Sequence, residues 1–181
     1  MCQFSPIEGK QTLADFFDVA KDVYPIGRLD YDSEGLLVLT NDKTFNHKLL
    51  NPEFKHEREY WVQVEGQVDE HALLQLERGV SISIDGKTYQ TLPAKASLFK
   101  NEPKVPERNP PIRFRKNIPT SWLSLILNEG RNRQVRKMTA AVGFPTLRLI
   151  RYRIERLNVQ GLEPGEMAIM KPGEINRALF R

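Results

Sequence analysis

Residues 27–40 read GRLDYDSEGLLVLT, an acidic loop framed by two glycines that runs directly into an apolar stretch. The loop places three carboxylates, those of Asp30, Asp32 and Glu34, within five residues. A buried carboxylate without a partner costs several kcal/mol or takes up a proton, so at most one of the three is expected to point inward. That carboxylate needs a cation, and Arg28, two positions before Asp30, is one candidate.

A second candidate cation lies in a helix predicted over residues 132–143. The apolar stripe of this helix consists of Val135, Met138 and Val142. Arg136 falls at the edge of the stripe, from which an arginine can reach toward a cleft, whereas Arg133 and Lys137 lie on the opposite side. We therefore expect Arg136 to meet an inward carboxylate, and Arg133 and Lys137 to face solvent or phosphate.

Apolar spacing, capping residues and turn residues divide the rest of the chain into short elements. Helices are expected over 12–20, 43–50 and 69–80, where Gly79 ends the last one, besides 132–143. Strands are expected over 36–40, 58–66, 121–130 and 146–155, with a hairpin over 81–92 that turns at Asp85-Gly86, and the tail from 162 predicts a hairpin, a strand and a last short helix. Helices interspersed with hairpin-forming strands favour an α+β fold, with a largely antiparallel mixed sheet flanked by helices.

The positive charge of the chain is concentrated in one segment. The net charge is +4, but residues 131–156 contain eight basic residues and one acidic residue, which gives this segment +7 and leaves −3 for the remainder. Such a basic stretch on a mildly acidic body is the usual electrostatic footprint of a protein that binds a phosphate backbone. A solvated charged face is the alternative interpretation.

Composition excludes several classes of protein. The chain has 181 residues and 40% apolar content, which is typical of a globular protein with one sizeable core. Because no apolar run approaches the roughly 20 residues of a membrane span and no signal pattern opens the chain, a cytoplasmic protein is expected. Cys2 is the single cysteine, and His47, His56 and His71 are scattered, so no disulfide and no metal site are predicted.

Residues 101–119 contain five prolines and a set of basic side chains. This stretch is too rich in proline for a central strand or a helix interior, so a long loop is predicted. Loops of this length in compact domains are usually functional or disordered. We interpret it as an arm that faces RNA, with Arg113 and Arg115 as candidate contacts.

Three stretches in this order and spacing resemble the pseudouridine synthases: GRLDYDSEGLLVLTND (27–42), REYWVQV (58–64) and NEGRNRQVRKMTAAVGFPTLRLIR (128–151). The resemblance runs from about residue 3 to residue 153 and is strongest to the RsuA-like branch, which acts on ribosomal RNA. RNPPIR (108–113), IPTSW (118–122) and GRNRQVRKM (130–138) are most similar to members that act on the large subunit.

The resemblance implies that the chain isomerises uridine to pseudouridine in ribosomal RNA, with no cofactor and no metal. It implies one catalytic domain over 1–181, in two lobes that share a sheet, with a central RNA-binding cleft. The family's catalytic aspartate falls on Asp30, its active-site tyrosine on Tyr60, and the arginine that pairs with the aspartate on Arg136. Only Asp30 would then enter the site, while Asp32 and Glu34 would serve the loop itself. The predicted RNA-binding residues are Arg28, Arg131, Arg133, Lys137, Arg148, Arg113 and Arg115.

The chain is also expected to begin just past the family's first strand, to lack a separate N-terminal RNA-binding module, and to be a monomer. Two other functions stay open on the residues alone. One is a non-catalytic RNA- or ribosome-binding protein with an inert acidic loop. The other is a metal-dependent nuclease that uses Asp30, Asp32 and Glu34 as magnesium ligands.

Overall fold

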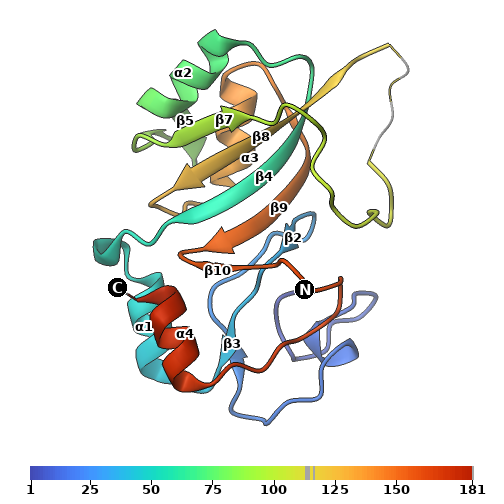
Figure 1. Ribbon diagram of the computed structural model, residues 1–181, viewed down its shortest axis with the longest axis vertical. Helices are drawn as coiled ribbons and strands as arrows, with labels where there is room; N and C mark the ends of the chain where they lie inside the picture. Colours follow the sequence, from blue (N-terminus) through green and yellow to red (C-terminus); the bar gives the residue numbers. More distant parts are fainter. Residues whose placement is uncertain (113–114, 116, 181) are drawn as a thin grey trace.

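The protein is built around a mixed six-stranded sheet, seen in a computed structural model that describes residues 1–112, 115 and 117–180 (Figure 1). The strand order is β10 (Leu157–Asn158), β9 (Thr146–Ile154), β4 (Arg58–Glu65), β8 (Thr120–Leu127) and β7 (Lys95–Leu98), and β2 (Glu34–Gly35) also pairs with β9. Every pair is antiparallel except β2 with β9. The predicted α+β class and mixed sheet are confirmed.

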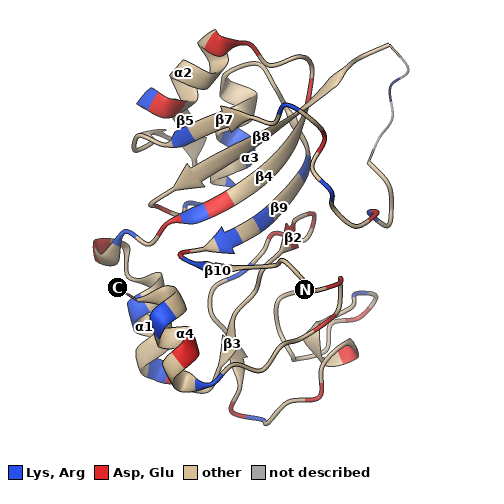
Figure 2. Cartoon of the chain, in the orientation of Figure 1, with Lys and Arg blue, Asp and Glu red and all other residues tan. Residues whose placement is uncertain are grey.

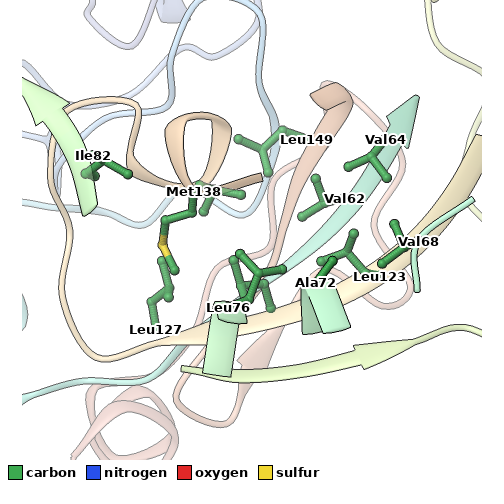
Figure 3. Close-up of a cluster of buried hydrophobic side chains, with 12 residues drawn as sticks. Val62, Val64, Val68, Ala72, Leu76, Ile82, Leu123, Leu127, Met138 and Leu149 are labelled. Atoms are coloured by element: carbon green, nitrogen blue, oxygen red, sulfur yellow. The ribbon is translucent and has the colours of Figure 1, made fainter. Parts of the chain in front are cut away.

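Two helices cover one face of this sheet and form the main core with it (Figure 3). These are α2 (Glu70–Arg78) and α3 (Gln134–Ala141). In β4, Val62 and Val64 alternate with polar residues and are fully buried, as the period of two predicts. Met138 of α3 and Leu76 of α2 pack against that face. The core therefore fixes α3, which carries the arginines of the candidate site, against β4 and β9.

A second hydrophobic cluster joins residues 26–49 to the C-terminal part of the chain. It joins α1 (Lys43–Leu50) and α4 (Pro172–Leu179), which lie side by side in Figure 1, through Phe45 and Phe180 in edge-to-face contact at 5.2 Å. Ile26, Leu36 and Val38 flank the acidic loop and are buried in this cluster or at its edge. Both flanks of the loop are thus fixed by apolar packing.

Local signals in the sequence account for most elements. Asp42 and Asp69 cap α1 and α2 by accepting hydrogen bonds from Thr44 N and Ala72 N at 2.7 Å each, and Gly79 ends α2. The predicted hairpin is β5 (Ser81–Ile84) and β6 (Lys87–Gln90), and its turn residues Asp85 and Gly86 both have positive φ.

The structure differs from the predictions at several places. Residues 12–20 form only a 3-10 turn at Leu13–Asp15, and Phe16, which an apolar helix stripe would bury, is 52% exposed. The strand over 36–40 is split, because Leu36 N donates to Arg151 O of β9 while Val38 O accepts from Ile26 N beside the small sheet of β1 (Tyr24–Pro25) and β3 (Leu39–Thr40). Strand β7 was not predicted, and within the described residues of the tail from 162 the predicted hairpin and strand are both absent, so that only α4 forms there.

The remaining elements are short. A second 3-10 turn spans Pro52–Phe54, and β10 adds two residues to the edge of β9. Within the described part of the chain, none of the helices has the length and apolar character that a membrane crossing requires.

The parallel junction of β2 and β9 depends on Gly35. Its φ is +108°, and a Cβ added there would lie 2.7 Å from the main-chain nitrogen of Arg151. For Gly35→Ala we expect the free energy of unfolding to fall by more than the about 1–3 kcal/mol that the backbone conformation alone costs, measured by urea denaturation. Gly86→Ala is the matched control, because Gly86 has φ +76° but nothing within 4 Å of an added Cβ. Equal losses at the two positions would show that the junction is not closely packed.

Candidate active site

The acidic loop, residues 27–35, is held at both ends by one buried arginine of β9. Arg151 is 7% exposed; its Nε donates to Leu36 O at 2.8 Å and its Nη1 donates to Arg28 O at 3.3 Å. The N-terminal segment adds a third anchor, because Leu29 N donates to Cys2 Sγ at 3.3 Å. These contacts fix the main chain on either side of Asp30 without using any side chain of the loop.

Asp32 is clamped by two arginines from the start of α3. Arg133 donates to both carboxylate oxygens, with Nη1 at 2.9 Å from Oδ1 and Nη2 at 3.0 Å from Oδ2. Arg136 Nη2 donates to the main-chain oxygen of Asp32 at 2.7 Å and lies 3.3 Å from Oδ2. The hydrogen bond from Arg133 is the main cause that holds the pKa of the Asp32 carboxyl below its ordinary value. Asp32 is therefore a structural anion.

Glu34 is clamped in the same way from the other side of the loop. Arg148 of β9 makes a two-pronged contact, with Nε at 3.0 Å from Oε1 and Nη2 at 2.7 Å from Oε2. Arg108, from the proline-rich segment, places its Nε 3.2 Å from Oε1. Two of the three carboxylates in the loop are thus each shared by two guanidinium groups.

Asp30 is the carboxylate that this arrangement leaves with the fewest ion-pair contacts, whereas exposure does not set it apart, since the side chains of Asp32 and Glu34 are 41% and 30% exposed. The side chain of Asp30 is 31% exposed, and its nearest ion-pair partner among the described residues is Arg133, with Nη1 3.7 Å from Oδ2. The predicted pair of Arg136 with Asp30 is wrong, because Arg136 binds Asp32, which lies two residues further along the loop. The prediction that Arg136 points inward holds, since its side chain is 11% exposed.

The two arginines of α3 are presented by a buried polar network that precedes the helix. Glu129 is buried and accepts from Tyr89 Oη at 2.5 Å, Leu92 N at 2.8 Å and Gln134 Nε2 at 2.6 Å. Gln134 in turn accepts from Arg131 N at 2.9 Å. Arg133, at the N-cap, has φ 53°, which turns its side chain toward the loop. Burial lowers the pKa of Arg136, and the negative charges of Asp32 and Asp30 oppose that shift.

Arg148 does not take the place predicted for it. It is 7% exposed and its Nη2 also donates to Pro106 O at 2.7 Å, so it cannot serve as a free phosphate contact. Figure 2 shows basic residues recurring along β9, but they face partners within the protein. Arg151 anchors the loop, and Arg153 pairs with Glu59 at 2.8 Å and Glu57 at 3.4 Å.

The other predicted site residues lie at different distances from the loop. Arg28 and Arg131 are exposed, and Arg131 lies over the ring of Tyr89 at 4.8 Å from its centroid. Lys137 is partly buried. Arg115 pairs with Glu65 at 2.7 Å, and Arg113 lies outside the described residues.

Tyr60 lies on β4 opposite Arg151 and packs at the edge of the main core. Among the described residues no hydrogen bond joins Tyr60 to Asp30. Tyr60 therefore lies beside β9, the strand whose Arg151 anchors the loop, and does not contact the Asp30 carboxylate directly.

Sequence reasoning missed Arg108, Arg151 and Glu129 as residues that build the site. Arg151 and Arg108 were counted only as positive charge, and Glu129 had no signal beyond its place before the glycine of GRNRQ. A metal site does not fit the loop, because the oxygens of Asp32 and Glu34 are already bonded to guanidinium groups. In the described ranges no three acidic, histidine or cysteine side chains are grouped as metal ligands.

Residues 8–141 match the family model described as RNA pseudouridylate synthase. The chain is 54% identical over 166 residues to ribosomal large subunit pseudouridine synthase E of Vibrio vulnificus (strain CMCP6), covering 92% of this chain and 68% of that protein. It is 49% identical over 155 residues to the protein of the same name from Xanthomonas axonopodis pv. citri (strain 306), covering 86% and 79%. A crystal structure of a pseudouridylate synthase is similar with TM-score 0.75 and 27% identity, covering 93% of this chain. This chain spans 65% of the length of that solved chain.

The contact between Arg133 and Asp32 predicts a specific dependence of stability on pH. A carboxyl whose pKa is lowered in the folded state stabilises the fold above its unfolded pKa, about 3.9, and loses that contribution as pH falls through the folded pKa. The free energy of unfolding of Arg133→Ala should lie below that of wild type by about 0.2–1 kcal/mol, since both side chains are over 40% exposed.

This difference should be constant from neutral pH to about pH 5 and shrink below about pH 4, measured by urea denaturation from pH 3 to 7. Arg156→Ala, at an exposed arginine of the same basic segment, is the control and should show no such profile. A difference between Arg133→Ala and wild type that grows as pH falls would contradict the assignment.

Proposed function

The chain belongs to the RNA pseudouridylate synthase family, and on this premise we propose that it converts uridine to pseudouridine at a specific position in large-subunit ribosomal RNA. The observation that carries the proposal is the state of the acidic loop. Asp32 and Glu34 are each neutralised by two arginines, whereas Asp30 has a single guanidinium near it, at 3.7 Å. The names of the relatives supply the substrate class.

The reaction requires a carboxylate and no redox step. The bond from C1′ of the ribose to N1 of uracil breaks, the base turns within the site, and a bond from C1′ to C5 forms. The proton on C5 is lost and N1 gains one, so the product is an isomer of the substrate. Asp30 can attack or stabilise the electron-poor C1′, or take a proton from its neighbour, and both routes need the ionised carboxylate.

The base must leave its stack before it can react, which costs a few kcal/mol unless it begins in a loop or bulge. In this proposal Arg28, exposed at the start of the loop, braces the vacated space. Tyr60 stacks on the flipped uracil or assists removal of the proton from C5. Because Tyr60 on β4 lies opposite Arg151 on β9, the same pair of strands positions Tyr60 and anchors the loop.

Binding of the RNA backbone falls to the cations that the loop does not use. Arg131 is exposed and Lys137 is partly exposed, and the two flank Arg133 in the sequence. They would contact phosphates without reading the sequence. The proposal takes the chain as one catalytic domain that acts as a monomer, in the cytoplasm, where its ribosomal RNA substrate is found.

The two alternatives have less support. A nuclease would have to replace guanidinium groups by magnesium on Asp32 and Glu34, which breaks four ion pairs that the loop needs. A purely RNA-binding protein leaves unexplained why two carboxylates are each neutralised by two arginines and the third is not.

Asp30→Asn should abolish isomerisation, with a loss of at least about 10³-fold, and leave folding and RNA binding near wild type, because an amide cannot act as nucleophile or base. Release of tritium from 5-tritiated uridine in large-subunit ribosomal RNA measures the reaction, in buffer with EDTA. Asp18→Asn, the same change at an exposed aspartate, is the control. Turnover of Asp30→Asn within tenfold of wild type would eliminate Asp30 as the catalytic group, and cleavage of the RNA that EDTA abolishes, without release of tritium, would favour the metal-dependent nuclease.

Affinity for an RNA fragment should fall steeply with salt, since each phosphate contact on single-stranded RNA contributes about −0.7 to the slope of log affinity against log salt. Replacing Arg131 and Lys137 together by alanine should flatten the slope by about 1.4 units. Arg78→Ala with Arg177→Ala removes the same charge from exposed positions on α2 and α4 and serves as the control. If both double variants flatten the slope equally, the contribution is one of net charge and not of this surface.

A further inference from the structure

We propose that Arg108 is a positioning residue for Asp30, through which the proline-rich segment 101–119 completes the catalytic site. The inference rests on the proposed function for its catalytic consequence, and its structural part can be tested separately. The segment was predicted to be an arm that faces RNA. The contacts of Arg108 show that part of this segment also binds the acidic loop within the protein.

Arg108 touches the acidic loop and β9 at once. Its Nε lies 3.2 Å from Glu34 Oε1, its Nη2 donates to Asp32 O at 3.4 Å, and its Nη1 donates to Leu147 O at 3.4 Å. The side chain is 20% exposed, so most of it is withdrawn from solvent. A guanidinium whose three nitrogens each contact a different acceptor connects segments of the protein and is not free to bind phosphate.

The segment around Arg108 is itself fastened to the sheet. Arg148 Nη2 donates to Pro106 O at 2.7 Å, and Trp122 Nε1 donates to Glu102 Oε1 at 3.1 Å. Figure 1 shows residues 99–112 leaving β7 and passing beside the sheet. The part from Glu102 to Arg108 is therefore held in place, and Arg108 is presented to the loop from a fixed base.

Arg108 shares its acceptors with the arginines of α3 and β9. Asp32 O accepts from Arg136 as well, and Glu34 accepts from Arg148 as well. Because Arg108 and Arg136 both donate to Asp32 O, their guanidinium groups meet at this carbonyl. The loop is thus held by α3, by β9 and by the proline-rich segment, and Arg108 makes the contact from the proline-rich segment.

Removing the contacts of Arg108 should lower the rate of the isomerisation rather than weaken the binding of substrate. Asp30 lies two residues from Asp32, so a shift of the Asp32 carbonyl moves the reacting carboxylate. A misplacement of about 1 Å costs on the order of 10²-fold in rate. For Arg108→Ala we expect kcat to fall by about 10- to 100-fold with KM changed by less than about threefold.

Arg108→Lys should restore part of the loss, since one ammonium can pair with Glu34 but cannot also span the carbonyls of Asp32 and Leu147. Lys104→Ala is the matched control, because it removes one exposed positive charge from the same segment. Its kcat should equal that of wild type. A double-mutant cycle of Arg108→Ala with Glu34→Gln should be strongly non-additive, because both changes release the same contact.

Hydrogen exchange tests the structural part without any activity measurement. Ser33 N donates to Asp30 O at 2.9 Å, and exchange of the peptide that spans residues 27–40 should be faster in Arg108→Ala and unchanged in Lys104→Ala. If Arg108→Ala does not fold, Arg108→Lys and the Glu34→Gln variant carry the same comparison. The proposal is overturned if kcat and exchange of Arg108→Ala both match wild type, or if only KM changes. A wild-type protein without isomerase activity would overturn the proposed function alone.

Discussion

Four arginines around two carboxylates, those of Asp32 and Glu34, are the constraint on which the rest of the site depends. Three like charges within five residues would repel one another in a loop of this size. The arginines come from α3, β9 and the proline-rich segment, so neutralising the loop also joins these elements. With the arginines engaged in this way, Asp30 is the one carboxylate of the loop that is not paired with two guanidinium groups.

Much of the framework could be predicted from the sequence because it is set by local patterns. Alternation in β4, the Asp69 cap and Gly79 stop of α2, and the Asp85-Gly86 turn each act within a few residues. The short 3-10 turn at Leu13–Asp15 was mistaken for a helix, since whether an apolar stripe packs depends on what lies opposite. The family indicated by the three motifs is confirmed by the comparisons.

The partners within the site could not be predicted in the same way. A helical wheel gives the direction of Arg136 but not its reach, and Asp30 and Asp32 are only two residues apart on the loop that it meets. Arg148 was predicted to bind RNA and Arg151 was counted only as positive charge, because a count of charges does not show which of them face a carboxylate or a carbonyl. Of the basic residues in 131–156, five are used inside the fold: Arg133, Arg136, Arg148, Arg151 and Arg153.

The parallel pairing of β2 with β9 has a consequence for biosynthesis. Gly35 is aligned with Arg151, so the loop leaves the ribosome long before the strand that receives it. Every arginine that holds the loop lies at position 108 or later, and β9 emerges last among the elements that carry them. At about 5–20 residues per second, the nascent loop carries uncompensated negative charge for several seconds. During that time it is repelled by the phosphates of the ribosome that makes it, and its carboxylates find all their arginine partners only after β9 has emerged.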